Sequence, residues 1–138
     1  MKQWVIDTNV VVSGLLNPRG PSARVLDAVV GGQVKLVYDA RILAEYRDVL
    51  GRPKFHLAPG RIAALLEGLG SQMLVTPASM AAPGPDPDDS VFVEAALATT
   101  DRTIVTGNLA HYPTEILHGV RVLTPAQAVA ELAQGLPA

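Results

Sequence analysis

The sequence contains no cysteine, and this absence excludes several kinds of chemistry at once. Without thiols the chain can form no disulfide, no thiolate nucleophile and no cysteine-based zinc or iron–sulfur site. The absence also fits a reducing compartment, and we expect a cytoplasmic protein. No apolar run approaches the roughly 20 residues of a membrane-spanning helix. The amino terminus begins a predicted strand rather than a signal peptide, so we expect no membrane association.

Several common catalytic motifs are also missing. Neither G-x-x-x-x-G-K-[ST] nor G-x-G-x-x-G occurs. His56, His111 and His118 lack H-E-x-x-H spacing, and we interpret them as surface or core residues rather than zinc ligands. A haloacid-dehalogenase-type phosphatase needs a second aspartate two positions after the first, where this chain has Asn9. These classes of enzyme are therefore disfavoured.

Length and composition are typical of one globular unit. The chain has 138 residues, 49% of them hydrophobic and 17% charged, and we expect a single domain over residues 1–138. The net charge of -2 attracts no polyanion overall. A cluster of basic residues leaves two interpretations open, a local basic patch or an ordinary solvated helix face. The cluster comprises Arg41, Arg47, Arg52, Lys54 and Arg61.

Short apolar runs alternate with longer periodic segments, which predicts an α/β fold with a mainly parallel sheet. Strands are expected at residues 4–7, 34–38, 103–106 and 120–123, with a weaker one at 73–76. Helices are expected at residues 21–30, 40–50 and 59–69, with further helices opening at Asp89 and at Thr124-Pro125. The proline-rich residues 77–87 are interpreted as a surface connection.

Three acidic residues stand where this alternation brings elements together. Asp7 ends the first strand, at the edge where α/β sheets build their sites. Glu45 borders the inward stripe of its helix, and Asp89 faces the core side of its first turn. Considered alone, Glu45 could equally be a solvated partner of Arg41 or Arg47, and Asp89 could be a helix cap.

Strand geometry separates two further candidates. A strand rises about 3.3 Å per residue, so the two ends of a five-residue strand lie about 15 Å apart. Asp101 precedes its strand, so we place it at the opposite edge and interpret it as a turn residue. Asn108 follows the same strand, two residues after Thr106, and is the better candidate for a fourth position beside Asp7.

Carboxylates that converge need a cation. Each anion raises the pKa of its neighbours unless positive charge neutralises the group. Oxygen ligands and a lack of nearby lysine favour Mg²⁺ or Mn²⁺. Such an ion activates water and offsets the charge that builds on a phosphodiester. The constellation therefore predicts nuclease chemistry.

Five segments follow one another along the chain: Val5-Ile6-Asp7-Thr8-Asn9-Val10, Leu43-Ala44-Glu45-Tyr46, Val49-Leu50-Gly51-Arg52-Pro53-Lys54, Asp86-Pro87-Asp88-Asp89 and Ile104-Val105-Thr106-Gly107-Asn108. This ordered set, which spans nearly the whole chain, resembles the PIN domain family, in particular the PIN-family toxins similar to VapC ribonucleases. It implies a three-layer α/β/α fold with a central sheet of four to five strands. It also implies a Mg²⁺- or Mn²⁺-dependent endoribonuclease, dimeric and held inactive by a cognate antitoxin.

Carried over by position, Asp7, Glu45 and Asp89 would be the catalytic, metal-binding carboxylates. Supporting roles would fall to Thr8, Asn9, Asp86, Thr106 and Asn108, and the sequence leaves open whether Asp86 or Asp88 assists Asp89. Asn108 stands where many family members have an aspartate, which removes one negative charge and should weaken metal binding. A catalytically weak scaffold that binds RNA or a protein partner is therefore the main rival, and a DNA-directed or structure-specific nuclease is the third possibility.

Overall fold

The structure is a computed structural model that describes residues 1–70, 73–74, 87–113, 117 and 119–134. Its centre is a five-stranded sheet in the order β3-β2-β1-β4-β5. The strands are β1 (Lys2–Ile6), β2 (Val34–Tyr38), β3 (Met73–Leu74), β4 (Thr103–Val105) and β5 (Arg121–Leu123). Every described pairing is parallel, which confirms the predicted α/β class.

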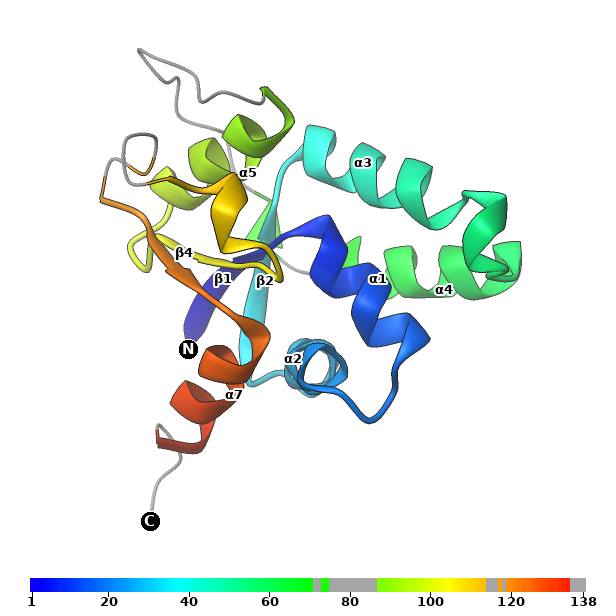
Figure 1. The fold of residues 1–138 in the computed structure, drawn as a ribbon, viewed down its shortest axis with the longest axis horizontal. Helices are drawn as coiled ribbons and strands as arrows, with labels where there is room; N and C mark the ends of the chain where they lie inside the picture. The colour runs from blue at the N-terminus through cyan, green and yellow to red at the C-terminus, as the bar shows by residue number, and fades with distance from the viewer. Residues whose placement is uncertain (71–72, 75–86, 114–116, 118, 135–138) are drawn as a thin grey trace.

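Helices cover both faces of this sheet. They are α1 (Thr8–Leu16), α2 (Pro21–Val30), α3 (Ala40–Leu50), α4 (Pro59–Gly70), α5 (Pro87–Leu97) and α7 (Pro125–Gln134), with short 3-10 helices η1 (Pro53–Phe55) and η2 (Leu109–His111). On one face α2 packs with α1, α7 and β2, and on the other α5 packs with α3 and the central strands. Figure 1 shows α2 and α7 at the bottom of the view and α3 and α5 at the top. The three-layer arrangement is confirmed. None of the described helices combines the length and apolar character needed to cross a membrane.

The core lies where these layers meet. Trp4, Val5 and Ile6 of β1 are buried, as are Val25 of α2 and Phe92 of α5. A parallel strand covered on both faces is apolar at successive positions rather than at alternate ones. Fully burying one large apolar side chain contributes about 1.5–3 kcal/mol, as an upper estimate. The middle of β1 is therefore held in place where it leads to Asp7.

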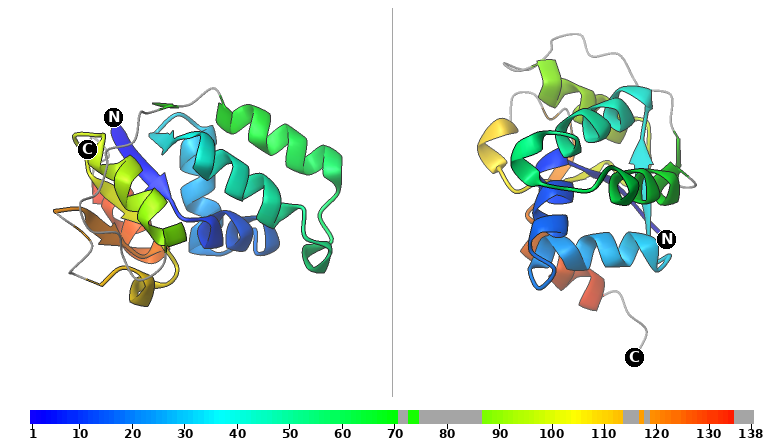
Figure 2. Two further views of the ribbon diagram at one scale, coloured as in Figure 1. Left: turned by 90° about the horizontal axis from the view of Figure 1, so that it is seen from above. Right: turned by 90° about the vertical axis from the view of Figure 1, so that its right-hand side faces the viewer.

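Two helices extend together from one end of the sheet. Figures 1 and 2 show α3 and α4 side by side, reaching away from the strands. The strand β2 leads directly into α3, and α1 packs against α3, with Thr8 at the start of α1 hydrogen bonded to Glu45 in the middle of α3. The first turn of α1 thus lies against the middle of α3.

Most predicted elements match the structure closely. The helices predicted at residues 21–30 and 40–50 and the strand at residues 34–38 have the observed bounds. The helix predicted to open at Asp89 begins two residues earlier, at Pro87. Residues 77–86, including Asp86 and most of the proline-rich connection, lie outside the described residues.

The helix α1 was not predicted. The β-branched run Val10-Val11-Val12 favours a strand by intrinsic preference. Packing overrides this preference, because Val10 and Val11 are buried on the face that meets the core. A close contact with α2 depends on Gly14, where an added Cβ would lie 2.5 Å from Cδ1 of Leu26. The helix therefore forms for tertiary reasons that local patterning does not contain.

Candidate active site

The strand order creates a switch point between β1 and β4. The chain leaves β1 for β2 on one side and later returns to β4 on the other. Ligands of open α/β sheets bind at the carboxyl ends of the strands at such a point. Asp7 follows β1 and Thr106 follows β4, and the backbone amide of Asp7 donates to the carbonyl of Val105 at 2.9 Å. Both side chains therefore stand at the edge where a site is expected.

The carboxylate of Asp7 is held by one oxygen. Its Oδ2 accepts hydrogen bonds from Oγ1 of Thr106 at 2.9 Å, from the hydroxyl of Tyr112 at 2.9 Å and from Nδ2 of Asn9 at 3.2 Å. Its Oδ1 accepts none from the residues that the structure describes. The residue is 6% exposed, with Oδ2 fixed by three donors and Oδ1 left without a hydrogen bond from the described residues.

Asp7 and Asp39 occupy equivalent places but behave differently. Each follows a strand and precedes a helix, the position in which a carboxylate caps the free amides of the first turn. Asp39 does so, accepting from the amides of Arg41 at 2.8 Å and Ile42 at 3.0 Å. Asp7 is the N-cap residue of α1 but makes no side-chain cap hydrogen bond. Its carboxylate is directed toward Thr106 and the sheet edge instead.

Glu45 reaches the same edge from α3. The side chain is half-buried, and its Oε2 accepts from the hydroxyl of Thr8 at 2.8 Å. Because Thr8 directly follows Asp7 in the chain, this hydrogen bond brings a second carboxylate next to the first. Arg41, one of the partners suggested for Glu45, instead forms ion pairs at 2.9 Å with Asp39 and with Glu94 of α5.

The pair Asp39 and Glu94 was not singled out from the sequence. Hydrogen bonding to Asp39 is the main reason that the pKa of Arg41 rises above its usual value, and Glu94 adds to the effect. The signal available for Asp39 was its position directly after β2, the same position that identified Asp7. No local signal links Glu94 to Arg41, because the two lie on different helices.

The pKa of Tyr46 is affected by the negative charge of this region. The side chain is fully buried in α3, and its hydroxyl donates to the carbonyl of Ile6. Burial raises its pKa well above 10.0, and the negative charges of Asp7, Glu45 and Asp39 raise it further. Tyr46 therefore stays protonated. The three carboxylates act on one buried hydroxyl, and such a negative potential favours a cation nearby.

The polar residues after β4 complete the edge. The amide of Gly107 donates to Oδ1 of Asn9 at 2.8 Å, and an added Cβ at Gly107 would lie 3.1 Å from that oxygen. Asn108 lies on the expected side, with its amide donating to Oγ1 of Thr106 at 3.1 Å. Its own side chain caps η2 by accepting from the amide of Ala110 at 3.2 Å, and its Nδ2 lies 2.9 Å from Nε2 of His111.

Asp89, the third predicted carboxylate, is described only by its backbone. Its backbone lies in the first turn of α5, together with that of Asp88, and the side chains of both are outside the described part of the structure. Among the described side chains, no group of three acidic or histidine residues is arranged to hold a metal ion. Asp7 and Glu45 supply two carboxylates. Mg²⁺ is commonly bound by one or two carboxylates together with water, so the donor set fits that ion.

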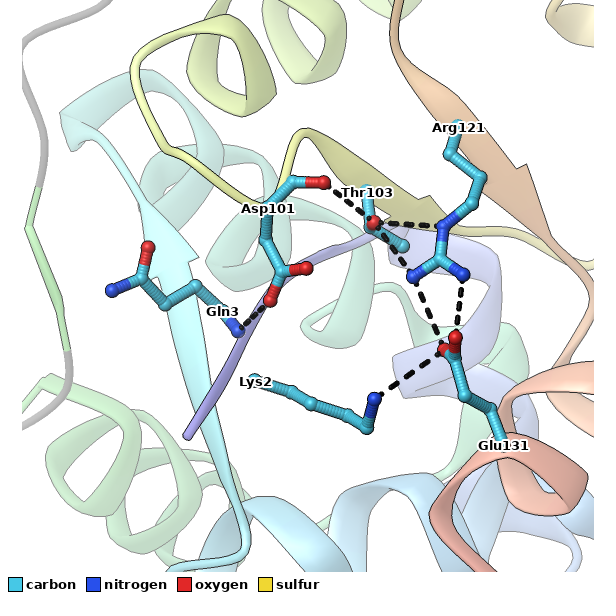
Figure 3. Close-up of polar contacts among 6 residues, drawn as sticks. All are labelled: Lys2, Gln3, Asp101, Thr103, Arg121 and Glu131. Atoms are coloured by element: carbon cyan, nitrogen blue, oxygen red, sulfur yellow. Dashed lines mark hydrogen bonds and ion pairs between the residues drawn. The ribbon is translucent and has the colours of Figure 1, made fainter. Parts of the chain in front are cut away.

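The opposite edge of the sheet behaves as predicted for Asp101. Its Oδ2 accepts from the backbone amide of Gln3 at 2.7 Å, close to the amino end of β1 (Figure 3). In the same view Arg121 of β5 bridges Thr103 and Glu131. The structure thus places Asp101 at the far end of the strands from Asp7 and assigns it to holding β1 beside the start of β4.

The basic cluster, which runs from α3 through η1 to α4, is exposed throughout. Arg41 pairs with Asp39 and Glu94, and Arg52 lies 3.4 Å from Asp48 one helical turn away. Lys54 places its ammonium 5.0 Å from the centre of the Phe55 ring. Arg41 and Arg52 are therefore exposed residues that pair with acidic side chains, whereas Lys54 lies over the ring of Phe55.

A parallel α/β/α sheet with carboxylates at its switch point defines a class of proteins that bind ligands at the carboxyl edge. A family model described as PIN domain matches residues 3–110 of this chain. The chain therefore belongs to the PIN domain family, a family of nucleases that act on nucleic acids and typically use divalent metals. No curated protein matches the chain.

Proposed function

We propose that this protein is a Mg²⁺- or Mn²⁺-dependent endoribonuclease in which Asp7, Glu45 and Asp89 hold the ion. One observation carries the proposal. Oδ2 of Asp7 is fixed by three neutral donors while its Oδ1 accepts no hydrogen bond from the described residues. Neutral donors orient a carboxylate without neutralising it, so the charge stays available to a cation.

The surrounding residues act as positioning groups. Thr106, Tyr112 and Asn9 fix the orientation of Asp7, and the hydroxyl of Thr8 fixes Glu45. A divalent ion, when bound, would offset the charge that builds on a phosphodiester during cleavage. Metal ligands that are already oriented in the folded protein lose little conformational entropy when the ion and the substrate bind. This lowers the free-energy barrier to the reactive geometry.

The biological role that we propose is that of a toxin in a toxin-antitoxin system. This role rests on the resemblance to PIN-family toxins, which also supports a homodimer and a cognate antitoxin. The proposed cytoplasmic location rests on the absence of cysteine, and the proposed single domain rests on the length of 138 residues. Expression in a bacterial host should arrest growth, and expression of Asp7→Asn should not. Co-expression of the product of a neighbouring gene should restore growth if that product is the antitoxin.

A cleavage assay tests the enzymatic proposal directly. Purified protein with Mn²⁺ should cut single-stranded RNA, and both a chelator and the substitution Asp7→Asn should stop the cutting. Parallel lanes with single-stranded DNA and flap substrates decide which nucleic acid is preferred. Cleavage of DNA but not RNA would overturn the ribonuclease assignment and leave a nuclease.

The second candidate is a catalytically weak PIN scaffold. Asn108 supports it, because this residue offers a neutral amide that already contacts Ala110 and His111. Intact RNA in every lane, combined with RNA binding in a filter assay, would favour the scaffold. Substitution Asn108→Asp gives a further test, since restored cleavage would show that the missing charge limits activity.

A further inference from the structure

We propose that a hollow beside the carboxylates is a base-binding subsite in which Phe55 stacks on one nucleobase of the RNA next to the bond that is cut. This inference rests on the proposed function and adds a recognition element to it. The hollow has a volume of about 490 Å³. It is lined by Thr8, Asn9, Val12, Ser13, Leu16, Asn17, Val49 and Phe55. Its size lies within the range of ordinary ligand pockets.

The position of the hollow ties it to the candidate active site. Thr8 and Asn9 belong to its lining, and these two side chains hydrogen bond to the carboxylates of Glu45 and Asp7. A group seated in the hollow therefore lies beside the residues proposed to hold the metal ion. Residues of α1 line the hollow and also hydrogen bond to the two carboxylates, so the proposed base-binding subsite and the proposed metal site are adjacent.

The walls of the hollow suit a flat apolar ring. Val12, Leu16 and Val49 supply aliphatic surface, and Leu16 is 52% exposed. Phe55, the last residue of η1, is the aromatic member of the lining. Base-aromatic stacking is the common means by which proteins hold single-stranded RNA.

Charge near the ring matches the rest of a nucleotide. Lys54 holds its ammonium 5.0 Å from the centre of the Phe55 ring. The backbone turns sharply just beyond, where His56 has a φ of 52° and ends η1. A cation beside a stacked base is well placed to meet a phosphate of the same strand.

A second hollow on the other side of α1 supports the choice of occupant. It has a volume of about 370 Å³ and is lined by Asn9, Ser13, Ser22, Gly107, Asn108 and His111. Asn9 and Ser13 line both hollows, so the first turns of α1 separate an apolar space from a polar one. An RNA strand carries the same two surfaces, apolar base faces and a polar sugar-phosphate backbone.

The test compares Phe55→Ala with Phe55→Trp, which keeps an aromatic face. Binding of a labelled single-stranded oligoribonucleotide is measured by fluorescence anisotropy in chelator, so that no metal-dependent cleavage interferes. We expect Phe55→Ala to raise the Kd by about 5- to 150-fold, the size of one base-aromatic stack. Phe55→Trp should bind within about threefold of the wild type. Val30→Ala is the control, because Val30 is 75% exposed on α2 and lines neither hollow.

A second experiment locates the stacked base. Abasic nucleotides are placed one position at a time along the oligoribonucleotide. At one position the loss of the base should weaken binding to the wild type and have no further effect on Phe55→Ala, as for two halves of one contact. Equal binding by Phe55→Ala and the wild type would overturn the inference, and so would abasic profiles that are identical for both proteins.

A cleavage assay with Mn²⁺ separates this inference from the proposed function. Binding that depends on Phe55 without any cleavage would uphold the subsite and overturn the ribonuclease. RNA cleavage, together with RNA binding that Phe55→Ala does not weaken, would uphold the ribonuclease and overturn the subsite. Absence of both would overturn both.

Discussion

The two edges of the sheet treat their carboxylates in opposite ways. At the amino edge, Glu131 pairs with Arg121 and lies 3.9 Å from Lys2, and Asp101 accepts from a backbone amide of the neighbouring strand. At the carboxyl edge, the described partners of Asp7 are two hydroxyls and a carboxamide. At the first edge the charge of Glu131 is neutralised by basic side chains, and Asp101 joins two strands. The second is ordered by hydrogen bonds that leave the charge of Asp7 in place.

This difference separates structural carboxylates from candidate functional ones. A surface ion pair satisfies both charges and contributes up to about 1 kcal/mol to stability. A carboxylate held by neutral donors keeps its affinity for a cation, at a cost in repulsion with its neighbours. Substitutions at the carboxyl edge should therefore affect activity and metal binding, whereas those at the amino edge should affect stability.

The largest expected difference in RNA cleavage is between Asp7→Asn at the carboxyl edge and Asp101→Asn at the amino edge. Asp7→Asn should lower RNA cleavage about a hundredfold or more, because it removes a ligand of the proposed ion. Its free energy of unfolding should change by less than about 1 kcal/mol, since the asparagine oxygen can still accept hydrogen bonds. Asp101→Asn should keep cleavage and also change the free energy of unfolding by less than about 1 kcal/mol, because its oxygen can still accept from the amide of Gln3. Equal loss of cleavage in the two variants would contradict the division between edges.

Metal addition should sharpen the comparison without any substrate. A ligand that binds only the folded state at a hundred times its Kd adds about 2.7 kcal/mol to stability. Mn²⁺ or Mg²⁺ should therefore raise the Tm of the wild type and of Asp101→Asn, and leave that of Asp7→Asn unchanged. Thermal melts followed by circular dichroism with and without chelator measure this. A shift of equal size in Asp7→Asn would place the ion elsewhere.

Tyr46→Phe should remove part of the alkaline sensitivity of the protein. Burial and the acids around Tyr46 raise its pKa in the folded state. Its contribution is therefore complete below the unfolded pKa of about 10 and is lost as the pH rises through the folded pKa. The variant should lose about 1 kcal/mol at pH 7 with the hydrogen bond to Ile6. Urea denaturation near pH 9 and pH 11 should then show a smaller decline than in the wild type, and an equal decline would refute this.

The smallest effect is expected at the amino edge. Hydrogen bonding to Arg121 lowers the pKa of Glu131, and the charges of Arg121 and Lys2 contribute. The stabilisation is present above the unfolded pKa of about 4.3 and is lost as the pH falls through the lower folded pKa. Glu131→Gln should therefore cost about 0.5 kcal/mol at pH 7, with cleavage unchanged. Urea denaturation at pH 7 and pH 3 tests it, and a variant as sensitive to acid as the wild type would exclude this role.

Local patterns were sufficient for much of the fold. The bounds of α2 and α3 follow from apolar residues at helical spacing that stop at Gly31 and Gly51. They were insufficient for α1, whose valines prefer a strand and become helical because the core covers them. Propensity is weak beside the burial of several large side chains.

The candidate site divides in a similar way. Asp7 and Asn108 could be placed at one edge because each follows a strand of a parallel sheet. The contact from Tyr112 to Asp7 had no such signal, because it joins distant parts of the chain. The same holds for the ion pair between Arg41 and Glu94. Such partners depend on how elements pack, which a single sequence does not reveal.

By itself the sequence determined the alternation of strands and helices, the absence of thiol chemistry and the delivery of an aspartate to the end of the first strand. The tertiary structure decided that β4 lies beside β1, that Thr106 and Tyr112 hold Oδ2 of Asp7, and that α1 separates an apolar hollow from a polar one. The physical reason is the distance along the chain over which each kind of interaction acts. Periodicity and capping act over a few neighbouring residues, whereas strand order and side-chain partners are selected by packing the whole core.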